Sequence, residues 1–175
     1  PNSASASARE RWTWRTLTPT GIGRARTLLI APDAPTTHRI ASRAMSQVWC
    51  ARAAVPRISK SKGGPGGAIV LISSVASQIG SPGEYVWYAA SKGAIDSLTI
   101  GLARELVGDG IRVNAVSPGL IATEIHEPGR LERVSPMVPM KRPGSADEIA
   151  QSVVFLLSEA SSYTTGAILR VAGGR

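Results

Sequence analysis

A tyrosine and a lysine lie four residues apart in the stretch "YAASK", residues 88–92. On a helix, residues i and i+4 share one face, about one turn apart. A tyrosine has a pKa of ~10, and an ammonium beside it stabilises the phenolate and lowers that pKa. Such a tyrosine can give a proton to a carbonyl oxygen or accept one from an alcohol. Tyr88 and Lys92 are therefore candidate catalytic residues, although the same spacing also occurs in helices where both side chains are only solvated.

Two other stretches are expected to lie near this pair. Ser74 ends a continuous apolar run, "AIVLISS" at 68–74, which is typical of a strand buried on both faces of a parallel sheet. A second strand is predicted at 111–117, and Pro118 and Gly119 end it. Ligands bind beyond the carboxyl ends of the strands in such sheets. The sequence therefore predicts that three features distant in the chain meet at one sheet edge.

The remaining pattern supplies the elements that hold this edge in place. Apolar spacing predicts helices at about 44–60 and 86–107, and "GAILRVAGG" predicts a last strand. Ser145 and Glu148 form a capping-box pattern at the start of a further helix. The order strand, helix, strand, loop, helix, strand predicts an α/β fold with a parallel three-stranded sheet covered by helices.

Four motifs occur together and in a fixed order: "GGAIVLISSVAS", "YAASKGAIDSLT", "GIRVNAVSPGLIATEI" and "ADEIAQSVVFLLSEASSYTTGAILRVAGG". From about residue 44 to its last residue, the chain closely resembles the short-chain dehydrogenase/reductase family. The resemblance implies a partial Rossmann-like, doubly wound parallel sheet. It also implies NAD or NADP as cofactor and a small-molecule alcohol or ketone as substrate.

The resemblance assigns roles residue by residue. Ser74 would orient the substrate oxygen, Tyr88 would be the acid/base, and Lys92 would bind the nicotinamide ribose. Tyr88 rather than Tyr85 fits, because it alone precedes "AASK". Ser73 is expected to point to the opposite face of its strand. The nicotinamide and its phosphate side would be cradled by Pro118, Gly119, Ile121 and Thr123.

The chain departs from the family in its N-terminal part. The stretch "TLTPTGIGRA", residues 16–25, matches the family's phosphate-binding turn only at Gly21, Ile22 and Gly23 and nearby Thr16, and Leu17 replaces a glycine. No "Asn-Asn-Ala-Gly" segment is present. We expect the nucleotide-binding part to be degraded or truncated, with residues 1–43 as an irregular basic segment. The choice between NAD and NADP stays open.

Charge and cysteine content limit the partners and the compartment that the protein is expected to have. The formal net charge is +8, and the excess lies in residues 1–62, where eleven Lys and Arg face two acids. An organelle transit peptide, a nucleic-acid arm and a solvated terminus all fit this bias, and the solvated terminus is favoured because no basic helical face supports nucleic-acid binding. Cys50 is the one cysteine, which fits a reducing compartment, and no apolar run approaches the ~20 residues of a membrane helix. We expect a cytoplasmic protein without metal, nucleic-acid or membrane partners.

Two functions follow as hypotheses. The first is an NAD(P)-dependent oxidoreductase that interconverts a secondary alcohol and a ketone. The second is a catalytically inactive member of the family that acts as a subunit-interaction module, because family helices such as 44–60 and 86–107 pack between subunits. A homo-oligomer is expected in both cases. Residues 124–139, within a long polar loop at 122–144, fit either a substrate lid or simple packing.

Overall fold

The computed structural model describes residues 35–175, with side chains from Ala44 onward. These residues form one unit around three parallel strands in the order β1-β2-β3. The strands are β1 (Gly67–Ile72), β2 (Ile111–Pro118) and β3 (Ile168–Val171). Gly67 pairs with Ile111, and Ala115 pairs with Ile168. The predicted parallel three-stranded sheet is confirmed, and its three carboxyl ends lie at one edge.

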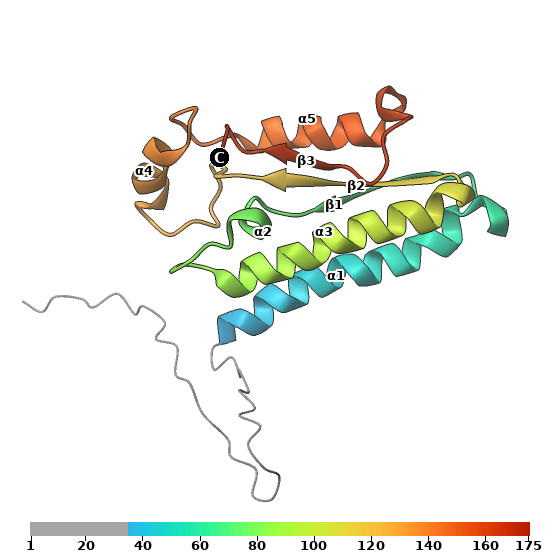
Figure 1. Ribbon diagram of the computed structural model, residues 1–175, viewed down its shortest axis with the longest axis horizontal. Coiled ribbons are helices and arrows are strands. Elements are labelled where there is room, and N and C mark those ends of the chain that lie inside the picture. The colour runs from blue at the N-terminus through green and yellow to red at the C-terminus, as the bar shows by residue number, and fades with distance from the viewer. Residues whose placement is uncertain (1–34) are drawn as a thin grey trace, which may run out of the picture. The chain divides into compact units, whose positions relative to one another are not determined.

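Helices cover both faces of the sheet (Figure 1). On one face α1 (Pro35–Ile58) and α3 (Val86–Leu106) run side by side, and on the other lies α5 (Ala146–Leu157). Two short helices, α2 (Ala76–Ile79) and α4 (Arg130–Val134), lie in the connections that follow β1 and β2. The arrangement is the doubly wound, Rossmann-like α/β architecture that the sequence predicts.

The start of α5 is fixed by its own side chains. Ser145 Oγ accepts a hydrogen bond of 3.2 Å from the Glu148 amide, and the Glu148 carboxylate accepts one of 2.7 Å from the Ser145 amide. These two bonds satisfy amides that the first turn of a helix otherwise leaves unpaired. The predicted capping box is therefore confirmed.

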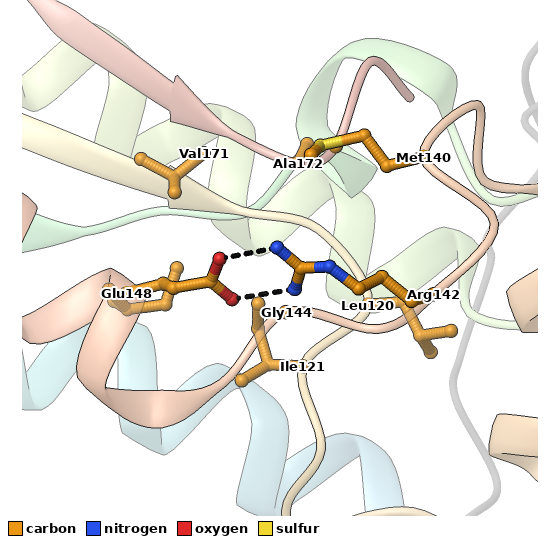
Figure 2. A pocket seen from close by; sticks show the side chains of 10 residues that line it. Leu120, Ile121, Met140, Arg142, Gly144, Glu148, Val171 and Ala172 are labelled. Carbon is orange, nitrogen blue, oxygen red and sulfur yellow. Dashed lines mark hydrogen bonds and ion pairs between the residues drawn. The ribbon is translucent and has the colours of Figure 1, made fainter.

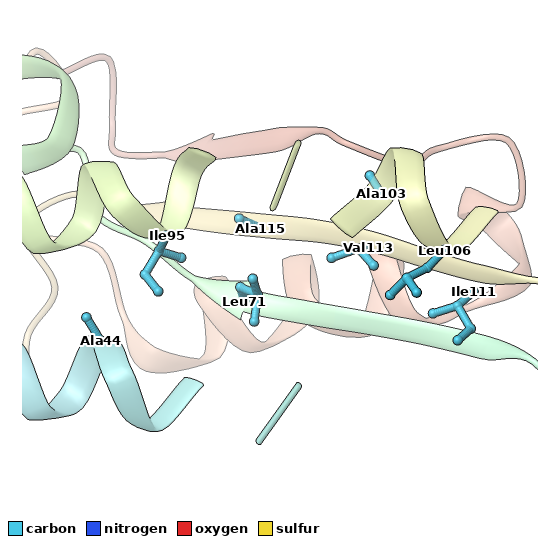
Figure 3. Close-up of a cluster of buried hydrophobic side chains, with 8 residues drawn as sticks. All are labelled: Ala44, Leu71, Ile95, Ala103, Leu106, Ile111, Val113 and Ala115. Carbon is cyan, nitrogen blue, oxygen red and sulfur yellow. The ribbon is translucent and has the colours of Figure 1, made fainter. Parts of the chain in front are cut away.

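The main core lies between the sheet and the α1–α3 layer (Figure 3). Ile95 of α3 and Ile111 and Val113 of β2 are fully buried. Burying an aliphatic side chain of this size stabilises the fold by about 1.5–3 kcal/mol. The buried cluster consists of Ala44, Leu71, Ile95, Ala103, Leu106, Ile111, Val113 and Ala115. This packing fixes α3 against the sheet and thereby fixes the position of its first turns.

Three sequence predictions are corrected by the structure. The helix expected from about residue 44 begins at Pro35, because proline at a first helical position has its φ already set and loses no hydrogen bond. β1 is less buried than predicted: it is an edge strand of the described sheet, Leu71 is its buried residue, and Ile72 is 39% exposed. The loop at 122–144 contains α4, and Val134 and Val138 are buried against Leu120.

Among residues 35–175, no helix is both long enough and apolar enough to span a bilayer.

Candidate active site

Ser74 is held where β1 and β2 end. Beyond the last residue of β1, the Ser73 amide donates to the Val116 carbonyl at 2.8 Å, and the Val75 amide donates to the Pro118 carbonyl at 3.0 Å. Ser74 lies between these two bonds and is buried. Its Oγ accepts a hydrogen bond of 3.2 Å from the Ala76 amide at the start of α2. Ser74 therefore follows the strand instead of ending it, and its backbone is anchored on both sides.

Tyr88 and Lys92 lie on the first turns of α3. Lys92 Nζ is 5.6 Å from the centre of the Tyr88 ring, a distance at which a cation is attracted to an aromatic face. The same ammonium donates a hydrogen bond of 2.7 Å to the Ile72 carbonyl at the end of β1. The structure thus brings the tyrosine, the lysine and the carboxyl end of β1 together. In the part of the chain described, no hydrogen bond joins Ser74 to Tyr88.

Asp96 continues the series of residues spaced by four along α3. Its carboxylate accepts a hydrogen bond from Ser73 Oγ, which also lies 3.4 Å from the Lys92 carbonyl oxygen. The two neighbouring serines therefore serve different helices, Ser73 binding α3 and Ser74 binding α2. The spacing from Tyr88 and Lys92 is the sequence signal for Asp96, because i+4 and i+8 positions share one helix face.

Gln47 of α1 binds the same end of β1 from another side. Its Oε1 accepts a hydrogen bond of 2.7 Å from the Ile72 amide, and its Nε2 donates one of 3.1 Å to the Ile72 carbonyl. Nothing in the sequence marks this residue, since a glutamine on a helix is ordinarily solvated and belongs to no motif here.

The segment after β2 carries the residues predicted to cradle a nicotinamide. The Gly119 amide donates to the Val171 carbonyl at 3.0 Å, which holds the segment against β3. Further along, the Ala122 amide donates to the Gly144 carbonyl at 2.8 Å. His126 Nε2 donates a hydrogen bond of 2.8 Å to the Ile121 carbonyl. Backbone bonds therefore define the path from Gly119 to Ile121, while the Thr123 side chain is exposed.

A small cavity of about 100 Å³ opens beside this segment (Figure 2). Figure 2 shows the Arg142 guanidinium and the Glu148 carboxylate pointing toward each other, and two hydrogen bonds of 2.9 and 2.7 Å join them. The hydrogen bond from Arg142, followed by that from the Ser145 amide, lowers the pKa of Glu148 to about 2. The rest of the lining is largely apolar and comes from both sides of the segment, including Leu120, Ile121, Val171 and Ala172.

Arg130 ties α4 to the turn that precedes α3. One guanidinium nitrogen donates a hydrogen bond of 2.8 Å to the Glu84 carboxylate, and the guanidinium carbon lies 5.2 Å from the centre of the Tyr85 ring. The hydrogen bond to Arg130 lowers the pKa of Glu84 below its usual value. The segment at 124–139 is thereby connected to residues only a few positions before Tyr88.

The donors at this edge fit one half of a nicotinamide dinucleotide. An ammonium and a phenol at the carboxyl ends of parallel strands are suited to ribose hydroxyls and to a reacting carbonyl, and open α/β sheets bind ligands at this place. The predicted phosphate-binding residues Gly21, Ile22 and Gly23 lie outside the described residues. Within the described residues, Tyr88 and Lys92 could hold the nicotinamide end of such a cofactor, and the residues predicted for its pyrophosphate lie outside them.

A family model described as "Enoyl-(Acyl carrier protein) reductase" matches residues 18–175. "Uncharacterized oxidoreductase YgfF" of Escherichia coli (strain K12) is 58% identical over 130 residues, which are 72% of this chain and 53% of that protein. "Galactitol 2-dehydrogenase (L-tagatose-forming)" of Cereibacter sphaeroides is 40% identical over 160 residues, 88% of this chain and 62% of that protein.

The fold has similar solved structures. The crystal structure of a 3-oxoacyl-acyl-carrier-protein reductase with bound NAD from Brucella melitensis superposes with a TM-score of 0.71 and is 37% identical. The match covers 81% of this chain and 52% of that chain. Across these relatives, the chain spans between 52% and 62% of the length of the protein that it matches.

Proposed function

The chain belongs to the short-chain dehydrogenase/reductase family, and on that premise we propose that it is an NAD(P)-dependent oxidoreductase acting on a secondary alcohol or a ketone. The observation that carries this proposal is the pairing of Tyr88 with Lys92 on one face of α3, beside the carboxyl end of β1. A relative named a galactitol 2-dehydrogenase that forms L-tagatose supports it, because oxidation of a polyol at carbon 2 gives a ketose.

Each residue of the site has a defined role in this proposal. Tyr88 gives a proton to the carbonyl oxygen during reduction and accepts it back during oxidation. Lys92 places a positive charge beside the phenol and donates hydrogen bonds to the ribose hydroxyls of the cofactor. Ser74 orients the substrate oxygen toward Tyr88. The bound nicotinamide supplies or accepts the hydride, and the protein supplies position and charge.

The cofactor in this proposal is NAD or NADP. The nicotinamide and the neighbouring phosphate would contact the turn after β2, where Gly119 and Ile121 are fixed by backbone hydrogen bonds. The other residues proposed for the cofactor are Pro118 and Thr123, with Gly21, Ile22 and Gly23 from the N-terminal part. NAD bound to the Brucella melitensis relative supports a nicotinamide cofactor and leaves the choice between the two open.

Self-association in the cytoplasm belongs to the same proposal. Large apolar side chains are exposed on two helices, including Trp49 on α1 and Val154 and Phe155 on α5. Exposed apolar surface of this kind is typical of contacts between subunits. A homo-oligomer that binds a small alcohol or ketone, and neither nucleic acid nor membrane, is the assembly that we propose.

A second function is favoured by the same exposed side chains. The chain would then be a catalytically inactive member of the family that serves as a subunit-interaction module. The two functions differ in one respect that is easily measured, because a module of this kind needs no dinucleotide.

Titration with NADH and with NADPH, followed by nicotinamide fluorescence, separates the two functions. The oxidoreductase predicts a saturable change with at least one of the two cofactors, and the preferred cofactor then answers the question that the sequence leaves open. An unchanged signal for both at millimolar cofactor contradicts the oxidoreductase and favours the interaction module.

A further inference from the structure

The backbone amide and carbonyl of Ile72 form hydrogen bonds with side chains from two different helices. Gln47 of α1 binds both its amide and its carbonyl, at 2.7 and 3.1 Å, and Lys92 of α3 donates to the same carbonyl at 2.7 Å. We propose that Gln47 is a positioning residue, which fixes the Ile72 peptide and, through its carbonyl, the ammonium of Lys92.

The place of Ile72 on the sheet explains why its peptide needs a partner. Amides of β1 and of the residue after it donate to the β2 side, as Gly67 does to Gly110 and Ser73 does to Val116. Because successive residues of a strand direct their amide and carbonyl to opposite sides, the amide and carbonyl of Ile72 face the side of β1 that pairs with no other strand within residues 35–175. The side-chain amide of Gln47 offers one donor and one acceptor there, as the peptide of an adjacent strand would.

A fixed carbonyl restricts an otherwise flexible lysine. The ammonium of lysine sits on a four-carbon stem and adopts many positions unless a fixed acceptor holds it. A carbonyl oxygen has two lone pairs, so the Ile72 oxygen can accept from Gln47 and Lys92 together. Its orientation thereby sets where Lys92 Nζ lies relative to the Tyr88 ring, 5.6 Å away. This inference rests on the proposed function only because the proposed function assigns Lys92 a role in proton transfer and cofactor binding.

A purely structural role for Gln47 would predict that a variant at position 47 loses stability without a specific change at Lys92. We expect nearly unchanged stability instead, because Ile72 is 39% exposed and water can replace the lost hydrogen bonds. A positioning role instead predicts a change at Lys92 without a matching change in stability. The suitable variant is Gln47→Met, which keeps the length of the side chain and removes both hydrogen-bonding groups.

The first test needs no cofactor. The ε-amines of the protein are acylated at low reagent concentration, and the extent of labelling at each lysine is read by mass spectrometry. We expect labelling of Lys92 to rise severalfold in Gln47→Met, while Lys60 and Lys62 keep their wild-type labelling. Gln151→Met, which makes the same change at an exposed position of α5, is the control and should leave Lys92 unchanged.

The second test measures the coupling between Gln47 and Lys92 in dinucleotide binding. We expect Gln47→Met to weaken dinucleotide affinity about 2–10-fold, the effect expected for the loss of a hydrogen bond between neutral groups. It should also move the pH profile of alcohol oxidation upward. Adding Gln47→Met to Lys92→Met should cause no further loss, because residues that act through one another are not additive.

The outcomes separate this inference from the proposed function. Unchanged labelling of Lys92 in Gln47→Met would overturn the positioning role, and so would fully additive losses in the double variant. If the wild-type protein binds no dinucleotide, the proposed oxidoreductase fails. The labelling experiment alone then decides whether Gln47 positions Lys92.

Discussion

Gly119 packs directly on Ala172, so that a Cβ atom at position 119 would lie only 2.7 Å from the Ala172 Cα. The contact is with backbone, which cannot turn aside as a flexible side chain would. We predict that Gly119→Ala costs about 1–3 kcal/mol of unfolding free energy, the usual range for overpacking, and that it weakens cofactor binding. Urea unfolding measures the first effect and dinucleotide titration the second.

The matched control for this change is Gly101→Ala in α3, where an added Cβ meets nothing within 4 Å. Alanine is favoured over glycine within a helix by up to ~1 kcal/mol, so this variant should be more stable than the wild type. A Gly119→Ala protein that unfolds at the wild-type urea concentration would show that the turn after β2 can shift away from Ala172 without loss.

Lys92 is predicted to serve both proton transfer and cofactor binding. Lys92→Met keeps a similar length and removes the positive charge that lies 5.6 Å from the centre of the Tyr88 ring. We expect oxidation of alcohol to require a higher pH and the cofactor affinity to fall in the same variant. Lys92→Arg should restore only part of each, because a planar guanidinium replaces a compact ammonium.

The measurement is the pH profile of turnover together with dinucleotide affinity for the wild type and both variants. Lys62→Met, at an exposed lysine remote in sequence from the site, controls for the loss of one positive charge. If Lys92→Met kept both the pH optimum and the affinity of the wild type, Tyr88 and Lys92 would be ordinary neighbours on a helix.

Glu148 gives stability a defined dependence on pH. Hydrogen bonds from Arg142 and Ser145 lower its pKa from 4.5 to about 2 in the folded chain. A carboxyl whose pKa is lower in the folded than in the unfolded state stabilises the fold fully above its unfolded pKa. This contribution is lost as the pH falls from about 4.5 toward about 2.

We therefore predict that Glu148→Gln is less stable than the wild type at neutral pH and that the two unfolding curves converge on acidification. Thermal unfolding over a series of pH values measures the difference. Asp147→Asn removes another negative charge from the same first turn of α5 and separates the capping box from the general effect of that charge. A difference between Glu148→Gln and the wild type that stays constant across the acidic range would contradict this prediction.

A variant of Arg130 distinguishes the two interpretations of the segment at 124–139, a substrate lid or simple packing. Its side chain is 13% exposed and joins α4 to Glu84 and to the ring of Tyr85. If the segment is a substrate lid, Arg130→Met should raise KM for the alcohol or ketone and leave dinucleotide affinity unchanged. Stability should fall by about 1 kcal/mol or less, because water reaches the Glu84 carboxylate, whose side chain is 39% exposed.

The control for Arg130 is Arg133→Met, an exposed arginine on the same short helix. Steady-state kinetics on both variants and the wild type give the comparison. An unchanged KM in Arg130→Met would indicate that the segment has only a packing role. The burial of Val134 and Val138 against Leu120 is consistent with such a role.

The sequence predicts the sheet and its helices because their signals are local. A run of β-branched residues marks β1, and the Ser145–Glu148 spacing marks the start of α5. The burial of β1 is predicted wrongly because it depends on which strands lie beside it, and a single strand does not carry that information. The start of α1 at Pro35 is missed because the nearby prolines and threonines are also typical of loops.

The site also contains some residues that the sequence predicts and others that only the folded structure shows. Tyr88, Lys92 and Ser74 can be named in advance because they belong to motifs with a fixed spacing. Gln47 belongs to no motif, and its contact with Ile72 arises only when α1 packs beside the end of β1. Asp96 lies within the stretch "YAASKGAIDSLT", but its hydrogen bond from Ser73 arises only when α3 packs beside the end of β1.

The measurement that tests the central claim most directly is turnover of Tyr88→Phe with a panel of secondary alcohols and ketones. We predict a loss of about 10²–10⁴-fold, the usual contribution of a general acid/base, with unfolding and dinucleotide binding close to wild type. Tyr85→Phe, which keeps the ring that contacts Arg130, should retain wild-type turnover. A Tyr88→Phe protein that turns over as fast as the wild type would contradict the assignment of Tyr88 as the acid/base.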